Sequence, residues 1–192
     1  MIPLALLAII SIYILIERSI VIFKAARLDE TFMTRIRDYI HEGEVDSAVR
    51  LCKSTPGPFA RLILKGINRI GRPMNDVLVA IENTGNIEIA SLSKGLAWLA
   101  TSAAGAPMLG FLGTVIGMVK AFYSIASAGN SASIGDFAGG IYTALVTTVA
   151  GLIVGIAALF AYNYLVARIN KVMNLMEART MEFMDLLNEP VK

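Results

Sequence analysis

The sequence predicts an all-α integral membrane protein with three transmembrane helices, long helices that extend into the cytoplasm and a small cytoplasmic helical domain. The 192-residue chain is 56% hydrophobic and 17% charged, with a mean hydropathy of +0.65. A soluble domain of this length carries about 25% charged residues. The charges are also unevenly placed, because residues 1–16 have none and Asp136 is the one charged residue between Ala121 and Ala167. Long uncharged stretches of this kind predict membrane spans.

The first element expected is a transmembrane helix over residues 1–23. A helix needs about 20 apolar residues to cross the hydrocarbon core, and this segment meets that length, with Glu17 and Arg18 toward one end. No basic segment precedes the apolar run and no small-residue cleavage site follows it. The segment is therefore interpreted as a retained anchor rather than a cleaved signal peptide.

Residues 24–94 are expected to form the cytoplasmic helical domain. Apolar residues recur at helical spacing over residues 31–53, and His41-Glu-Gly43 is expected to break this stretch into two helices. The turn sequence TPGP follows, and its last residue, Pro58, suits the first turn of another helix. Asn75 or Asp76 is expected to cap the last helix of this domain, which runs toward the second span.

Two further spans are expected over residues 95–123 and 134–166, joined by a short link at 124–133. The third span is long enough to leave the membrane while still helical, and it continues as a cytoplasmic helical tail at 167–192. Apolar residues in and just before this tail recur at spacings of three, four or seven, so one face needs a partner. The helices of residues 24–94 and neighbouring copies of the chain are both possible partners. The apolar positions are Leu165, Ile169, Val172, Met176, Phe183 and Leu187.

The distribution of basic residues predicts the orientation in the membrane. Residues 24–94 contain eleven Lys and Arg and residues 167–192 contain four more, whereas the link at 124–133 contains none. Basic segments stay on the cytoplasmic side. The C-terminus is therefore expected to be cytoplasmic, and the N-terminus and the link are expected to face outward.

The residue types present do not favour catalysis or metal binding. His41 is the only histidine and Cys52 the only cysteine; we interpret them as a surface or capping residue and a small core residue. No phosphate-binding loop, zinc signature or serine-hydrolase motif occurs in the sequence. We therefore expect no enzyme activity, no cofactor and no metal. The basic residues form no run of the nucleic-acid-binding type.

Small residues recur at a spacing of four in the second and third spans. Gly113 and Gly117 form one such pair, and Gly151 and Gly155 form another. Glycines at this spacing let helix backbones approach closely in a bilayer. All four are expected to be helix-packing positions, and the pair in the third span is expected to bring copies of that helix together.

Three threonines accompany the glycines of the third span. Thr143 and Thr147 continue the glycine stripe, whereas Thr148 lies one residue around the helix. Each hydroxyl either bonds back to its own helix or contributes to a wet or partner-facing surface. The spacing leaves both interpretations open.

The spans place no acid at mid-membrane. Their charged residues are Asp136, Lys120 and the neighbouring Glu17 and Arg18, and each of these lies near a span end. A proton device in a membrane normally needs an ionisable group within the span. If protons cross here, the carrier at mid-membrane must therefore come from another chain.

Two sequence motifs resemble the ExbB/TolQ/MotA proton-channel family, and most of all its ExbB branch. They are APMLGFLGTVIGM at residues 106–118 and IYTALVTTVAGLIVGI at residues 141–156, and the resemblance extends to Ile16-Glu-Arg18. It implies a subunit of a proton-driven motor in the bacterial inner membrane. In that family five copies surround the transmembrane helices of a dimeric, ExbD-like, single-span partner that supplies a membrane Asp. Proton flow energises a TonB-like protein and thereby outer-membrane transport.

The resemblance also implies site residues and alternatives. The pore-lining threonines of the family match Thr114 and Thr148, with Thr143 and Thr147 as further candidates. Many members carry a glutamate where this chain has Thr143. The alternative functions are a TolQ-like or other motor subunit of the family and a membrane scaffold that transports nothing. The coupling ion is left open between H⁺ and Na⁺.

Overall fold

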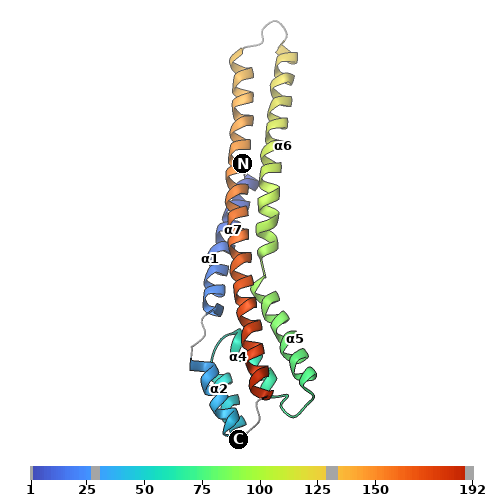
Figure 1. Cartoon of the computed structure of the whole chain (residues 1–192). Coiled ribbons are helices and arrows are strands. Elements are labelled where there is room, and N and C mark those ends of the chain that lie inside the picture. The colour runs from blue at the N-terminus through green and yellow to red at the C-terminus, as the bar shows by residue number, and fades with distance from the viewer. Residues whose placement is uncertain (1, 27–30, 129–133, 189–192) are drawn as a thin grey trace. The chain divides into compact units, whose positions relative to one another are not determined.

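The computed structural model describes residues 2–26, 31–128 and 134–188, and the regular elements in these ranges are α-helices. They are α1 (Ile2–Ala26), α2 (Thr31–His41), α3 (Val45–Ser54), α4 (Pro58–Ile67), α5 (Met74–Leu92), α6 (Leu96–Ala128) and α7 (Ile134–Asn188). Figure 1 shows their course along the chain. The described residues form two compact units, and the boundary between the units falls inside α1 and α7.

We call the first of these the membrane unit; it comprises residues 1–17 and 95–165. Three described helices have the length and apolar composition to cross a bilayer: Ile2–Ala26, Leu96–Ser127 and Ala138–Asn188. The all-α membrane fold predicted from the sequence is therefore confirmed.

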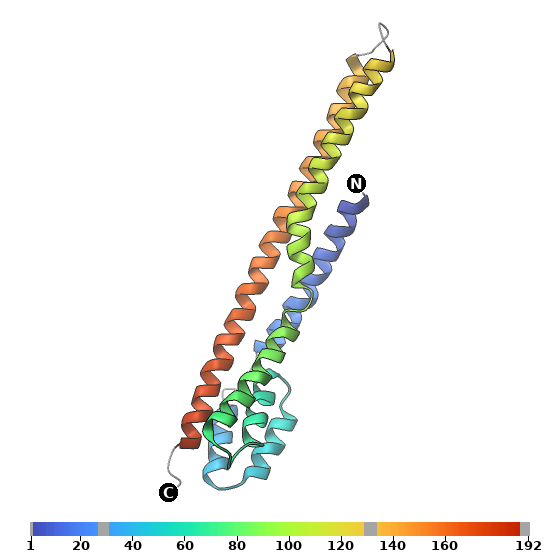
Figure 2. The same ribbon diagram turned by 90° about the vertical axis from the view of Figure 1, so that its right-hand side faces the viewer.

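In the membrane unit, α6 and α7 lie side by side in both ribbon views (Figures 1 and 2). α6 continues to Ala128, beyond the span end expected at residue 123, so residues 124–128 of the expected link are helical. The rest of that link, 129–133, lies outside the described residues. Pro107 occurs inside α6, where its missing N–H removes the helical hydrogen bond to the carbonyl of Ala103.

The N-terminal part of α1 packs in the same unit. Leu4, Ser11 and Ile14 are buried, and the hydroxyl of Ser11 donates to the carbonyl oxygen of Leu7 at 2.7 Å. Bonding within its own helix lets this serine occupy an apolar contact. A small apolar cavity between α1 and α7, lined by Ser11 and Ala158 among others, shows that these two helices face each other.

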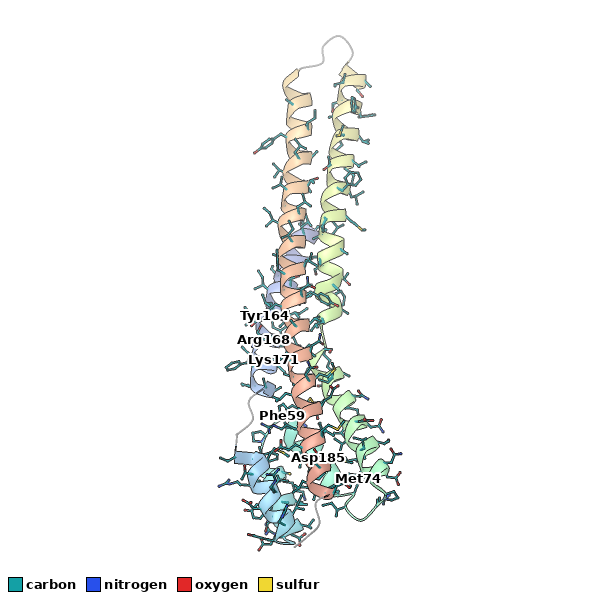
Figure 3. The ribbon with its side chains drawn as sticks, in the orientation of Figure 1. Phe59, Met74, Tyr164, Arg168, Lys171 and Asp185 are labelled. Carbon is teal, nitrogen blue, oxygen red and sulfur yellow. The ribbon has the colours of Figure 1, made fainter. Side chains whose placement is uncertain are left out.

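We call the second unit the charged unit; it comprises residues 18–94 and 166–192. Consecutive helices from α2 to α5 pack on one another. Gly43 and Gly57 adopt φ angles of +74° and +132° in the turns that precede α3 and α4, a region where L side chains are strained. Phe59, labelled in Figure 3, lies in the first turn of α4 and is 2% exposed.

The cap expected for α5 is wrong. The N-cap residue is Pro73, and no side chain caps the helix there. The carbonyl of Pro73 accepts the N–H groups of Asp76 and Val77 at 2.9 and 3.3 Å. Asn75 and Asp76 therefore lie inside the first turn, where the Asp76 carboxylate interacts favourably with the positive end of the helix dipole.

The apolar face of the α7 tail packs within the chain. Val172, Met176 and Phe183 are between 0% and 3% exposed. A Cβ placed on Gly66 of α4 would lie 2.5 Å from Phe183 and 2.7 Å from Ile81 of α5. The helices of residues 24–94 are therefore the partner of this face.

Candidate functional site in the membrane unit

Glycines bring α6 and α7 into backbone contact. A Cβ on Gly151 would lie 2.6 Å from the carbonyl oxygen of Ala106 and 2.9 Å from the Cα of Gly110. A Cβ on Gly155 would lie 2.5 Å from the ring of Pro107. Real Cβ atoms do not approach neighbours this closely, so only glycine fits at these two positions without a shift of the backbone or the proline ring.

The glycines of α6 face the same contact from the other side. A Cβ on Gly117 would lie 2.7 Å from the Cβ of Ala144, and Gly113 lies against the methyl group of Thr147. All four glycines singled out in the sequence thus lie between α6 and α7 of one chain. For Gly151 and Gly155 this differs from the expected contact between copies, because the neighbouring antiparallel helix of the same chain already occupies the stripe.

Two of the four candidate threonines meet across this contact. The hydroxyls of Thr114 on α6 and Thr148 on α7 are hydrogen-bonded to each other. Thr148 Oγ1 also lies 3.0 Å from the carbonyl oxygen of Gly110, and Thr114 Oγ1 lies 3.3 Å from that of Ala144. Both side chains are half-buried.

The other two threonines do not join this cluster. Thr143 donates to the carbonyl of Gly139 at 2.9 Å, and Thr147 donates to that of Thr143 at 3.0 Å. Both bonds run back along α7, which is the usual arrangement for a threonine in a helix. Thr143 is exposed, so a longer side chain at this position has room outside the pair.

The Thr114–Thr148 cluster can redistribute protons among its hydrogen bonds. Each hydroxyl has a single proton to donate and two lone pairs that accept. Each one has more than one acceptor within hydrogen-bond distance. Thr148 can therefore donate either to Gly110 or to Thr114, and Thr114 can donate either to Ala144 or to Thr148. The cluster remains neutral in each arrangement.

Sequence reasoning missed the carbonyl groups that complete the cluster. Gly110 and Ala144 contribute backbone carbonyl oxygens as acceptors. Every residue has such an oxygen, so the residue type does not reveal which of them accept. One signal was available for Gly110, because it lies three residues before Gly113 and so belongs to the same helix face.

Comparison with known proteins identifies the family. The model of the "MotA/TolQ/ExbB proton channel family" matches residues 54–178, which include the threonine cluster and the four glycines. The chain belongs to the MotA/TolQ/ExbB proton channel family.

Individual relatives are named ExbB. The putative biopolymer transport protein ExbB homolog of Methanothermobacter thermautotrophicus is 32% identical over 135 residues, which cover 70% of this chain and 47% of that protein. The putative biopolymer transport protein ExbB-like 1 of Synechocystis sp. is 42% identical over 91 residues, 46% of this chain and 36% of that protein. The biopolymer transport protein ExbB of Neisseria meningitidis is 30% identical over 171 residues, 83% of this chain and 77% of that protein. The matches thus span less than half the length of the first two relatives.

The helices of this family member expose large apolar side chains along α6 and α7. Phe111, Tyr142 and Phe160 are 65%, 72% and 72% exposed in the single chain. A soluble protein does not expose so many large apolar side chains. In this family of membrane proteins, lipid or other transmembrane helices are available to cover them.

Proposed function

We propose that the chain is an ExbB-like, non-enzymatic subunit of a proton-driven motor in the bacterial inner membrane. Several copies, five by the family resemblance, form a ring around the transmembrane helices of an ExbD-like partner. Proton flow through the complex energises a TonB-like protein and thereby outer-membrane transport. The observation that carries the proposal is the Thr114–Thr148 hydroxyl pair, held at an apolar helix contact by glycines that belong to the matched family region.

The chemistry of this pair suits a proton path in which the acid lies on another chain. A hydroxyl both donates and accepts, so it can receive a hydrogen bond from a water or a carboxylic acid and pass another onward. It does not titrate, so it holds no charge in the membrane, where an unpaired charge is costly. The partner's Asp would supply the group that gains and loses the proton.

The proposed arrangement follows the expected domain bounds. Spans at residues 1–23, 95–123 and 134–166 cross the membrane, the N-terminus and the link at 124–133 are periplasmic, and residues 24–94 and 167–192 are cytoplasmic. Support comes from the basic residues gathered in these last two segments. The partner-facing surface of the ring would lie beside Thr114 and Thr148.

The test is Thr148→Val, which removes the hydroxyl and keeps the shape of the side chain. The net contribution of one hydrogen bond is about 1 kcal/mol. If its loss raises the barrier to proton transfer by this amount, we expect the proton flux to fall by roughly fivefold to tenfold. The flux is measured in proteoliposomes that contain the complex purified with its partner, and native mass spectrometry checks that the complex stays assembled.

Thr101→Val is the matched control for this test. Thr101 is an exposed α6 threonine that donates to the carbonyl of Ala97 in its own helix at 2.8 Å. Its replacement should leave the flux unchanged. Unchanged flux in Thr148→Val as well would remove this threonine from the proton path.

A membrane scaffold that transports nothing is the second candidate. The glycine contacts between α6 and α7 favour it, because close packing alone accounts for them. The two functions differ in one measurement, since a scaffold with its co-purified partner gives no proton flux above that of empty liposomes. A TolQ-like role would show the same flux with a different energised protein.

A further inference from the structure

Charge is divided between the helices of the charged unit. Residues 47–75 contain six basic residues and no acid, whereas residues 73–93 contain three acids and no base. The basic residues are Arg50, Lys53, Arg61, Lys65, Arg69 and Arg72. The acids are Asp76, Glu82 and Glu88. The unit thus has a positive part that runs from the second turn of α3, after Asp46, through α4, and a negative part at α5.

Exposed basic residues on α3, α4 and the following turn form what we call the basic face: Arg50, Lys53, Lys65 and Arg72. Arg61 is not included, because its guanidinium forms a two-bond ion pair with Glu88, at 2.5 and 2.6 Å. These hydrogen bonds raise the pKa of Arg61 further. The unit therefore satisfies one cation internally and presents the four residues of the basic face outward.

A groove with the opposite charge lies between α5 and the C-terminal part of α7. Its volume is about 320 Å³, and Glu82 and Glu177 line it; both are exposed. Met176 and Met181 contribute flexible apolar side chains to the lining, and Asn86 adds a polar one. Figure 3 labels Arg168 and Lys171 farther up α7 and Asp185 near its end, and the Arg179 that lies between them is ion-paired with Glu182 at 2.6 Å. We call this site the acidic groove.

We propose that the acidic groove receives the basic face of a second copy of this chain. Lys and Arg side chains suit this groove, because their methylene stems pack on methionine while their cationic heads reach the two glutamates. The two surfaces are different parts of the same unit, so each copy binds one neighbour through its groove and another through its basic face. Contacts of this head-to-tail kind close into a ring when the rotation from one copy to the next divides a full turn evenly, as the proposed ring requires.

This inference rests on the proposed ring and specifies which surfaces build it. Anionic lipid is the other chemistry that a basic face attracts, but it leaves the acidic groove unoccupied, whereas a second copy covers both surfaces. Charge pairs of this type set the partner and its orientation more than they set the affinity. Pairing of the two surfaces should therefore depend on ionic strength.

Cross-linking tests the contact directly in the full chain in native membranes. Met181→Cys and Lys65→Cys, combined in one chain and treated with a short bismaleimide, should give a ladder of covalent multiples of the chain. Each single variant should give none, because a head-to-tail contact pairs unlike positions. Cys52 need not be removed, because it is buried and its thiol has a pKa raised to about 12.

Charge reversal tests the electrostatic part. Glu82→Lys with Glu177→Lys should weaken each contact about tenfold, which corresponds to about 1.4 kcal/mol. Because a ring contains several such contacts, the ring fraction in native mass spectra should fall by at least that factor, and Lys65→Glu with Arg72→Glu should have the same effect. The fourfold variant restores opposite charges and should recover the ring. Glu42→Lys, an exposed change of the same sign in the turn before α3, is the control and should have no effect.

The outcomes separate this inference from the proposed function. Intact rings that neither cross-link nor respond to reversal overturn the inference and leave the motor proposal standing. Absence of any homo-oligomer overturns both. A cross-link of Met181→Cys to itself, a cross-link to a protein of another mass, or a basic face whose reversal changes only lipid binding would each overturn the second copy as the occupant.

Discussion

Cys52 illustrates how burial controls the chemistry of a single residue. The side chain is 3% exposed in α3, and desolvation raises the pKa of its thiol from about 9.0 to about 12. Below pH 9 the folded and unfolded states both keep the proton, so pH has no effect through this group. Between pH 9 and 12 the unfolded state ionises first, and the stability contributed by the neutral buried thiol is lost.

We therefore predict that the stability of the wild-type protein relative to Cys52→Ala is constant from pH 7 to 8.5 and falls between pH 9 and 12. The measurement is the difference between the two thermal unfolding midpoints in detergent at each pH. This difference removes the pH dependence that comes from all other groups, because both proteins share them. A difference that stays flat up to pH 12 would contradict the burial of the thiol.

Gly66 provides the second prediction at this scale. In Gly66→Ala, the new methyl group would meet Phe183 and Ile81 within 2.7 Å, and overpacking of this kind costs about 1–3 kcal/mol. Better helix propensity returns up to about 1 kcal/mol, so we expect a net loss, seen as a lower thermal unfolding midpoint. Gly85→Ala in α5 is the control, because among the described residues its methyl group would meet only Leu62, at 3.8 Å. Stability in Gly85→Ala should not fall.

At the residue scale, the sequence predicted side-chain chemistry better than backbone geometry. Thr114 and Thr148 were singled out by the family resemblance, and the structure brings their hydroxyls together. Their pore-lining role stays a prediction. The carbonyl of Gly110 was not foreseen, because every residue has a carbonyl and only the helix contact selects one. The predicted cap of α5 was also wrong because of backbone geometry. Pro73, with φ fixed by its ring at −50°, is the non-helical residue at which the helix begins, so neither Asn75 nor Asp76 is needed as a cap.

At the scale of elements, the contact between α6 and α7 is the feature most sensitive to mutation. In Gly151→Ala the added methyl group would meet the Ala106 carbonyl and the Gly110 backbone within 3 Å, and backbone gives way less readily than side chains. We predict that the helices separate locally and that the hydrogen bond from Thr148 to Gly110 weakens. Faster amide hydrogen exchange in α7 would show the separation.

Gly105→Ala is the control for that prediction. Gly105 also lies within α6, but a Cβ there would meet nothing within 4 Å among the described residues. Its replacement should leave hydrogen exchange in α7 unchanged or slightly slower, because alanine is the better helix former. Equal exchange rates in Gly151→Ala and the wild type would argue against the close contact.

Helix positions followed from periodicity, but some helix ends did not. The break near residues 41–43 and the start of α4 at Pro58 match the turn chemistry of the sequence. Residues 124–128 were assigned to the link because serine and alanine predominate there, but α6 continues through them. Once a helix is already formed, such residues extend it at little cost.

For the whole molecule, the long uncharged stretches were sufficient to predict the membrane fold. The sequence did not reveal that the boundary between the two compact units falls inside α1 and α7, because both helices continue through it without a turn signal. It also left open which surface covers the α7 tail. Both possible partners present apolar faces, and only packing distinguishes them.

Orientation is the prediction that belongs to this scale. Eleven basic residues in 24–94 and four in 167–192 should hold these segments in the cytoplasm. A C-terminal reporter that fluoresces only in the cytoplasm should therefore be active, and one inserted in the link at 124–133 should be inactive. The opposite pattern would reverse the proposed topology.

The glycine contact between α6 and α7 also has a consequence for helix register. Gly, Ala and Thr alternate along both sides of the contact, so the two surfaces are nearly featureless and close packing alone discriminates weakly between positions one turn apart. A slide of one turn offers each threonine another backbone carbonyl, but it separates the hydroxyls of Thr114 and Thr148, whose mutual hydrogen bond forms only in the observed alignment. The same hydroxyls that we assign to the proton path would then also fix how far one helix is slid along the other.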